Sequence, residues 1–578
     1  MSDKVYVPGM GSFGAKLMVI AEAPSYQETA AGKPLVGPSG KEFDRLCADA
    51  GINRGDLWIS NVFKYEIPPN EGKKKIPAWI RAQQVGIDIE ESLTELQTEI
   101  NSIKPNCILG LGGTALWALT GIKPKSKKKE REDTTATYTP TGGIQDYRGS
   151  ILLGMGRKCV HTYHPAHLLH QQGEIKGYWN RQVMIFDFKR ALQQSQFPEI
   201  NRPIRNLQIC KSSYELQEFR ERYKSSTKMS VDIEARGHCL PVCIGIAFNK
   251  HHGMCIPLWN DGEISSIPTA DLVQIWIILA EMLYEKGIIG QNFNYDRDKI
   301  RRLGFIIRKL ISDTMFKAFA INPELPKGLA FNTSIYTEEP FYKNEGMYEG
   351  SINDLLLGCA RDACVTFEVD EAMELDLIEL GQVTFYNNFL MKLPELYLGI
   401  ENQGFRVDTE QRDKLLHKYI EWDERLRYEL FKLVGSPVNV NSPKQVYELL
   451  FIVLKCPIRQ TTGEEDLTSL LNLQSFTDET KRRIVELILE DRRVRKTIST
   501  YLMAMPDYDG RMRTTYFPCL DTGRSSTGQQ DPPIRPIIEV IGEDGKPKKK
   551  VFGTAFQTIT KHGDIGQDIR SMYVPDEI

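Results

Sequence analysis

The stretch KMSVDIEA, residues 228–235, decides how the middle of this chain folds. Its apolar residues alternate, which predicts a β-strand whose successive side chains point to opposite faces. Asp232 and Glu234 are two positions apart, so both carboxylates project from the same face. Neighbouring carboxylates repel each other and are costly to take out of water. A bound divalent cation would relieve both costs, so the strand is a candidate metal site.

Two later stretches supply further carboxylates. In GQNFNYDRDKI, residues 290–300, Asn292 and Asp296 lie four apart where a helix is predicted to begin, so we expect them to share a face. In CARDACVT, residues 359–366, Asp362 lies in another predicted helix. Oxygen ligands from separate elements suit two Mg²⁺ ions about 4 Å apart, which activate water and stabilise the leaving oxygen of a phosphodiester.

The order of these motifs resembles the DEDD-type 3′–5′ exonucleases, specifically the proofreading domain of family A DNA polymerases. The resemblance covers residues 205–380 and includes a phage-like linking segment, PELPKGLAFNTSIYTEEPFYKNEG, at 323–346. It implies an RNase H-like fold, a single-stranded DNA 3′ end as substrate, and two Mg²⁺ or Mn²⁺ ions. The metal ligands and catalytic residues that it implies are Asp232, Glu234, Asp296 and Asp362.

One position departs from that family's pattern. The family has Tyr four residues before the last Asp, or His five before it, to orient the attacking water. Here those places hold Gly358 and Leu357. Loss of one such group costs about 10²–10⁴-fold in rate, so metal binding is the firmer expectation and cleavage is a hypothesis.

The composition is that of an ordinary globular protein. The chain has 578 residues, 41% hydrophobic and 26% charged, with a net charge of −3, and its length predicts three or four domains. The bulk charge argues mildly against a nucleic-acid binder. Basic residues instead gather in the segments 71–75, 123–132 and 546–550. We expect the first two to be solvated loops, with specific DNA-contact loops as the less favoured alternative.

The eleven cysteines show no CxxC spacing. We expect them to be buried thiols in a reducing compartment, and metal ligation is the less favoured alternative. The N-terminal residues lack the apolar core of a signal peptide, and no apolar run is long enough to cross a membrane. These features predict a protein of the cytoplasm, the host cytoplasm for a phage protein, with no membrane partner.

The first 195 residues alternate apolar strands with helical segments, as an α/β domain does. Four stretches stand out by their order: MVIAEAPSYQETAAGKPLVGPSG at 18–40, LWISNVFKYEIPP at 57–69, KPNCILGLGGTAL at 104–116 and CVHTYHPAHLL at 159–169. Together they resemble the uracil-DNA glycosylase superfamily, particularly its iron–sulfur, thermophile-type branch. The resemblance implies an α/β/α sandwich over residues 1–195.

That resemblance assigns a uracil pocket. Glu22 would position the attacking water, Asn61 would read the uracil edge, and His164 would stabilise charge on the departing base. Leu35 stands where the family has a stacking Phe. Tyr65 takes the place of a cluster cysteine and the four cluster cysteines are missing, so we expect no iron–sulfur cluster. Both excision of uracil and a retained DNA-binding fold without excision stay open.

From about residue 385 the pattern becomes largely helical and then changes to short extended pieces. Five segments resemble the thumb and the start of the palm of family A DNA polymerases: 393–408, 438–451, 491–505, 509–526 and 553–560. The stretch VIGEDGKPKKKVF, at 540–552, predicts a hairpin. In the TGRSS segment, Arg524, Ser525 and Ser526 would contact the template–primer backbone.

In that family the catalytic carboxylates and the fingers helix follow a segment like MYVPDE, at 572–577, and we expect them on a second polypeptide. The sequence therefore predicts a multidomain α/β replication protein, the N-terminal part of a phage-type family A polymerase. Whether it is a split subunit, an interrupted gene product or a truncation stays open. The rival hypotheses are a free-standing enzyme that excises uracil and trims ends, and a non-catalytic subunit that clamps DNA.

Overall fold

The computed structural model describes residues 4–70, 76–123, 142–169, 171, 175–235, 241–258, 267–343, 351–520, 522–528, 539–541, 547–549, 554–561 and 563–576. The lysine-rich segments 71–75 and 124–132 lie outside these residues. The chain forms two compact units, one ending at Lys392 and the other beginning at Leu393. The boundary predicted at residue 385 lies before the observed one, because α16 (Val383–Asn388) belongs to the first unit. Its Tyr386 Oη accepts a hydrogen bond from the Asp313 backbone N–H of that unit at 2.9 Å.

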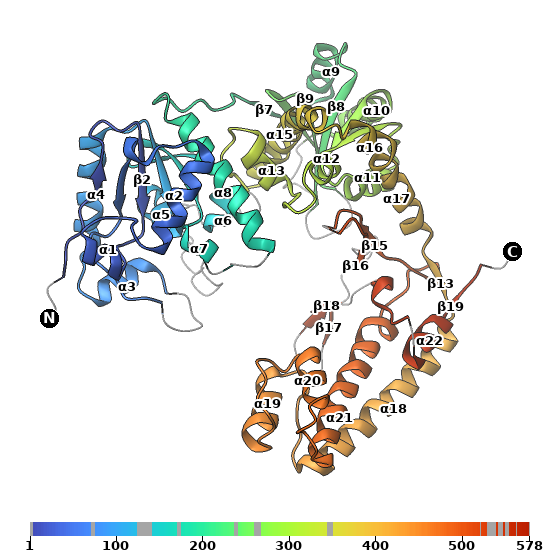
Figure 1. Ribbon diagram of the computed structural model, residues 1–578. Helices are drawn as coiled ribbons and strands as arrows, with labels where there is room; N and C mark the ends of the chain where they lie inside the picture. The colour runs from blue at the N-terminus through green and yellow to red at the C-terminus, as the bar shows by residue number, and fades with distance from the viewer. Residues whose placement is uncertain are drawn as a thin grey trace. The chain divides into compact units, whose positions relative to one another are not determined.

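The first unit contains two six-stranded sheets, each with its own apolar cores (Figure 1). In the first sheet the order is β1-β3-β2-β4-β6-β5, and the four inner strands are parallel. The edge strands β1 and β5 run antiparallel to their neighbours. The strand bounds are β1 Met10–Gly11, β2 Leu17–Ala21, β3 Trp58–Asn61, β4 Cys107–Leu111, β5 Ile151–Gly154 and β6 Arg157–Thr162.

Helices cover both faces of this first sheet, because β2 is apolar on both sides. Leu17 and Val19 pack toward α2 and α8, while Met18 and Ile20 pack toward α4 and α5. The helices are α1 Tyr26–Ala31, α2 Pro38–Ala50, α3 Ala78–Gln84, α4 Ile89–Ile103, α5 Gly112–Thr120, α6 Ile144–Tyr147, α7 Ala166–Leu169 and α8 Ile175–Gln194. This is the three-layer α/β/α arrangement predicted for the N-terminal domain.

The second sheet has the order β12-β11-β8-β9-β10-β7. Strand β9 is antiparallel to both of its neighbours, and the other adjacent pairs are parallel. The strand bounds are β7 Asn206–Ile209, β8 Lys228–Glu234, β9 Cys243–Asn249, β10 His252–Pro257, β11 Gly287–Gly290 and β12 Leu310–Asp313.

Strand β8 has one apolar face and one polar face, as its alternation predicts. Val231 and Ile233 pack into the apolar cluster that α9 and α10 cover. The opposite face meets the long helix α15, where Ser230 Oγ donates to the Ala363 backbone oxygen at 2.7 Å. The helices of this part are α9 Ser213–Arg222, α10 Thr269–Glu285, α11 Asn294–Arg302, α12 Thr314–Ile321, α13 Leu329–Tyr336 and α15 Ile352–Glu379.

Helix α13 and the segment after it contact the first sheet's domain. The buried Arg148 guanidinium pairs with Asp187 and donates to Ser334 Oγ of α13 at 2.9 Å. Further along, the rings of Tyr147 and Phe341 meet edge to face, with centroids 5.0 Å apart. The segment after α13 is thereby held in place before it reaches the second sheet.

The second unit is largely helical, as predicted. Its helices are α17 Leu393–Gln403, α18 Thr409–Val434, α19 Pro443–Tyr447, α20 Glu464–Leu471, α21 Glu479–Thr497 and α22 Asp564–Ser571, with π-helical turns at Glu448–Val453 and Ile498–Leu502. A small sheet has the order β14-β13-β19, from Arg511–Met512, Phe405–Val407 and Tyr573–Val574. The pairs β15/β16 (Thr515–Phe517, Ser526–Gly528) and β17/β18 (Glu539–Ile541, Pro547–Lys549) are antiparallel, and the second pair is the predicted hairpin.

Among the described residues, no helix has both the length and the apolar character that a membrane crossing needs.

Candidate active site

Three of the four predicted metal ligands converge where α15 crosses β8. Asp232 and Glu234 project from the polar face of β8, and Asp362 projects from α15 toward them. Each offers one carboxylate oxygen within 4.8 Å of the other two. Asp362 is fully buried. The strand period therefore placed the first pair correctly, and the sheet-to-helix packing supplies the third.

Asp296, the fourth predicted ligand, lies in the first turn of α11 beside this group, and its Oδ1 accepts from the Ile233 backbone N–H at 3.1 Å. The prediction that Asn292 and Asp296 share a helical face is wrong, because the helix begins at Asn294. Asn292 adopts a left-handed backbone with φ 52°, and its N–H donates to the Asp313 carboxylate at 3.0 Å.

The site's electrostatics favour a bound cation. Burial raises the pKa of Asp232 well above its usual range, and the nearby charges of Asp362 and Cys359 raise it further. Burial likewise raises the pKa of Glu234 to about 8 and that of Asp296 well above its usual range. A divalent cation would stabilise the ionised carboxylates, and clustered carboxylate oxygens are the donors that Mg²⁺ takes. The residues present therefore fit a divalent metal site.

Two residues that the motifs did not reveal contact Asp362. Tyr342 Oη donates to Asp362 Oδ1, and Lys343 Nζ lies 2.9 Å from Asp362 Oδ2. Both follow α13 in the predicted linking segment, while Gly358 lies on α15 at the place where the sequence resemblance led us to expect a tyrosine. Burial and the charge of Asp362 raise the pKa of Tyr342 well above its usual range, so its hydroxyl stays a donor. The sequence reveals the linking segment, but the contact between its Tyr342 and Asp362 depends on the tertiary fold.

The predicted uracil pocket lies at the carboxyl ends of the parallel strands in the first sheet, where α/β folds commonly bind ligands. Glu22 follows β2, Asn61 ends β3 and His164 follows β6. Gly112 allows a close approach, since a Cβ added there would lie 3.3 Å from His164 Cβ.

Glu22 is held by two residues that sequence reasoning missed. Its Oε1 accepts from Arg81 Nη2 at 2.8 Å, and its Oε2 accepts from Thr114 Oγ1 at 2.5 Å. Arg81 is on α3 and Thr114 is on α5. Neither belongs to a local pattern with Glu22, so the sequence offered no signal for the pairing.

Asn61 and His164 both present donors at this strand edge. Asn61 is 2% exposed, and its Nδ2 has no hydrogen-bond acceptor among the described residues. His164 Nδ1 accepts from the Ala166 N–H at 3.2 Å, which places the proton of the neutral ring on Nε2. Burial lowers the pKa of His164, against the opposing charges of Glu22 and Glu28. A neutral donor ring results.

Leu35 does not present a face to a base. It is 2% exposed, packs in the apolar cluster with Phe43, and has a left-handed backbone with φ 52°. Its N–H donates to Glu28 Oε1, which holds that conformation. It stands in the family's stacking position in sequence, but its side chain serves the core.

Tyr65 lines an open cavity of about 760 Å³, together with Tyr6, Trp58, Glu95 and Glu99. These side chains supply aromatic rings and oxygen or nitrogen atoms. An iron–sulfur cluster needs thiolates, so the residues around Tyr65 do not fit one.

The predicted DNA-contact residues of the second unit lie at a turn before β16. Arg524 is exposed, and its backbone oxygen accepts from the Leu520 N–H at 3.3 Å. Ser525 Oγ accepts from Gln557 Nε2 at 3.4 Å, and Ser526 begins β16. The arginine is therefore free to meet a ligand from solvent.

Comparison with known proteins identifies two parts of the chain. The model of the uracil DNA glycosylase superfamily matches residues 8–189, and that of DNA polymerase family A matches residues 409–577. The type-4 uracil-DNA glycosylase of Archaeoglobus fulgidus is 34% identical over 200 residues, which cover 32% of this chain and 87% of that protein. DNA polymerase I of Borreliella burgdorferi is 25% identical over 354 residues, which cover 58% of this chain and 38% of that protein.

A solved structure of the POL domain of Pol1 from M. smegmatis, in complex with DNA primer-template and dNTP, aligns with a TM-score of 0.48 and 16% identity, covering 64% of this chain and 59% of that one.

The chain thus joins a glycosylase-type α/β/α domain to a polymerase-type domain. Through residues 8–189 it belongs to the uracil DNA glycosylase superfamily, and it carries a family A DNA polymerase domain at 409–577, with DNA polymerase I relatives.

The repulsion among the buried carboxylates predicts an effect on stability. In the presence of EDTA and at a pH well above neutral, where the carboxyl is ionised, Asp232→Asn should raise the free energy of unfolding by about 1 kcal/mol, because it removes a charge that burial disfavours. Asp370→Asn is the control: Asp370 is a buried aspartate that pairs with Lys317 at 2.7 Å. That change should cost about 3 kcal/mol. Urea unfolding of both variants measures the difference, and destabilisation by Asp232→Asn would show that its charge is instead compensated.

Proposed function

We propose that this chain is a DNA-replication protein of the polymerase I kind whose middle part, residues 205–380, is a Mg²⁺-dependent 3′–5′ proofreading exonuclease. The observation that carries the proposal is the convergence of Asp232, Glu234 and Asp362 within 4.8 Å of one another. The sheet supports it as well: β9 alone runs against the other strands, and α15 covers the carboxylate face, as in an RNase H-like fold.

The chain's own residues would hold and orient the reacting groups. Asp232, Glu234, Asp296 and Asp362 would bind two divalent ions, which when bound activate water and stabilise the leaving oxygen. Tyr342 fixes the Asp362 carboxylate through its hydroxyl, which compensates in part for Gly358. Lys343 adds a positive charge beside Asp362, where it would help to attract the phosphate of a DNA 3′ end.

The carboxylate assignment predicts a difference between two aspartates of one helix. Asp296→Ala should lower the rate of release of 3′-terminal nucleotides from labelled single-stranded DNA at least about 10²-fold, because a metal ligand is lost. Asp298→Ala is the matched control: Asp298 is also on α11, but it pairs with Arg302 at 2.8 Å, so its rate should be unchanged. Gel-resolved time courses with Mg²⁺ and with Mn²⁺ measure both.

If the wild-type chain leaves the labelled strand intact with either ion, the exonuclease proposal fails and the DNA-clamping alternative is favoured. If both variants are equally slow, Asp296 contributes to the structure of α11 rather than to catalysis.

The Tyr342 contact predicts a specific loss of turnover. Tyr342→Phe should lower kcat about 10–100-fold with little change in KM, because a hydrogen bond to a charged group contributes about 1.5–3 kcal/mol. Tyr336→Phe loses a comparable bond, from Oη to Asp376 at 2.8 Å, away from the carboxylates, and should keep full activity. Equal rates for wild type and Tyr342→Phe would show that the Tyr342 hydroxyl has no role in the reaction.

A second candidate function is recognition and excision of uracil by the N-terminal domain. The supporting observation is the buried Asn61 Nδ2, which has no acceptor among the described residues and would pair with the O4 side of a uracil edge. The His164 Nε2–H would donate to negative charge on the departing base, and Glu22, oriented by Arg81, would position the water.

This geometry predicts excision from a duplex that carries one uracil. With the chain in excess, alkali-labile breaks should form, and Asn61→Ala should lower the single-turnover rate at least about 10²-fold. His167→Ala, in the same segment as His164 but exposed, is the control and should keep the wild-type rate. If wild type forms no breaks but still binds the duplex, the domain recognises DNA without excising the base.

The polymerase-type domain would bind the primer–template. The exposed guanidinium of Arg524 and the hydroxyls of Ser525 and Ser526 would contact backbone phosphates without reading sequence. Together the three parts describe a replication protein that binds DNA, removes 3′-terminal nucleotides and recognises uracil.

A further inference from the structure

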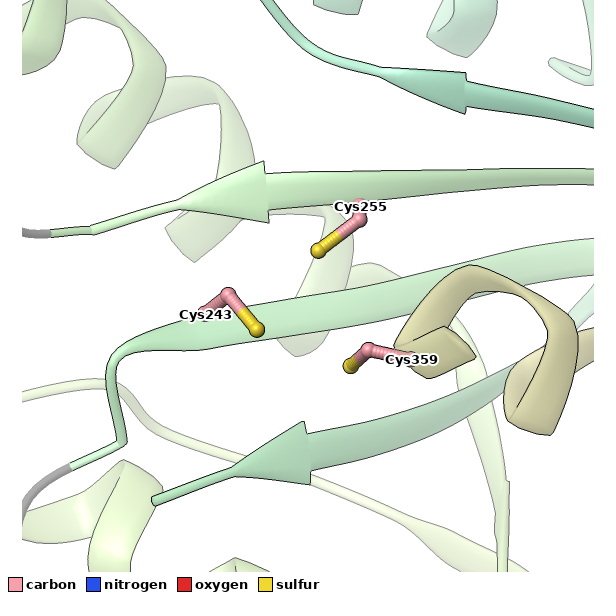
Figure 2. Close-up of side chains that lie close together, drawn as sticks. All are labelled: Cys243, Cys255 and Cys359. Carbon is pink, nitrogen blue, oxygen red and sulfur yellow. The ribbon is translucent and has the colours of Figure 1, made fainter. Parts of the chain in front are cut away.

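Three thiols from separate elements converge in the second sheet's domain (Figure 2). Cys243 is on β9, Cys255 on β10 and Cys359 on α15, and their Sγ atoms all lie within 4.8 Å of one another. All three are fully buried. The sequence predicted buried thiols and disfavoured metal ligation, because no CxxC spacing is present. The fold confirms the burial and adds the convergence.

The backbone arrangement explains why the thiols meet. In the antiparallel pair β9/β10, Cys243 lies opposite Pro257 and Cys255 lies opposite Gly245, so both cysteines share the sheet face toward α15. Gly245 permits close packing of the helix, because a Cβ added there would lie 2.4 Å from the Cys359 backbone oxygen. Helix α15 thereby brings its thiol onto the two from the sheet.

This arrangement differs from cysteines that merely fill a core. Cys210 and Cys364 are also buried, yet they are not in the cluster of thiols within 4.8 Å. In a tetrahedral zinc site, Zn–S bonds of about 2.3 Å put the sulfurs about 3.8 Å apart. The three thiols would need to approach by about 1 Å or less to reach that geometry.

A carboxylate oxygen lies next to one of the three thiols. Asp232 Oδ2 is 3.7 Å from Cys359 Sγ. Thiolate sulfur selects thiophilic ions over Mg²⁺. A divalent charge would also offset the thiolates and the neighbouring carboxylates in a buried setting.

We propose that Cys243, Cys255 and Cys359 bind one thiophilic divalent cation of the zinc type through their three sulfur atoms. Each thiol gives its proton to solvent as its sulfur–metal bond forms, so three protons leave as one cation enters. The site is separate in chemistry from the Mg²⁺ site and does not depend on nuclease activity. It would fasten α15 to β9 and β10 from the side of the sheet where the carboxylates lie.

The test uses the full chain, reduced and stripped of metal by a chelator. Titration with Co²⁺ in excess Mg²⁺ should produce a thiolate-to-cobalt charge-transfer absorption that saturates at one equivalent per chain. Zn²⁺ should abolish that absorption stoichiometrically. Because Mg²⁺ occupies oxygen sites and gives no such band, the signal reports the thiols alone.

Variants assign the band to these residues. Cys243→Ser, Cys255→Ser and Cys359→Ser should each weaken Co²⁺ binding at least about 10-fold. Cys364→Ser, a buried cysteine of the same helix outside the cluster, should leave binding unchanged. Circular dichroism checks that each variant is folded. Absence of the band in folded wild type overturns the proposal whatever the variants do, as does a band that persists when all three cysteines are changed.

Thiol counting gives an independent readout. The folded, zinc-loaded chain is first treated with mild peroxide and then denatured so that its thiols can be counted. The three cysteines should still be reduced. If Cys243 and either partner are instead found as a disulfide in the loaded chain, the cluster is a redox pair and the metal proposal is overturned.

Discussion

Repulsion among clustered, partly buried carboxylates is the constraint on which the arrangement of the middle domain depends. Asp232, Glu234 and Asp362 meet between β8 and α15, where burial raises the pKa of the first two. Such a group is tolerated only if something nearby compensates its charge. Lys343 meets Asp362 from one side, and a divalent cation would complete the compensation. The carboxylate cluster therefore lowers the stability of the fold locally, and metal binding would offset that loss.

The carboxylates could be predicted because their placement follows from local periodicity. Period two along β8 puts Asp232 and Glu234 on one face, and the pairing of β17 with β18 agrees with the hairpin predicted for the stretch 540–552. Tyr342 and Arg81 were missed because their contacts join elements distant in sequence, which no local pattern encodes. Asn292 was misplaced because the Asp313 carboxylate accepts from its N–H and holds the backbone outside α11.

The segment after α13 connects the two sheets of the first unit. In the glycosylase-type domain, Arg148 donates a hydrogen bond to Ser334, and the ring of Tyr147 packs against Phe341. The next residue, Tyr342, donates a hydrogen bond to Asp362. The position of the Tyr342 hydroxyl therefore depends on packing against the neighbouring domain. This gives a physical reason for the two domains to fold as one unit, and it places the Tyr342 hydroxyl on the Asp362 carboxylate.

Electron paramagnetic resonance of Mn²⁺ bound to the full chain tests the two-metal account most directly. The account predicts two bound ions per chain with the exchange-coupled spectrum of a pair about 4 Å apart, and loss of that coupling in Asp232→Asn. A spectrum of isolated Mn²⁺, unchanged by Asp232→Asn, would contradict it.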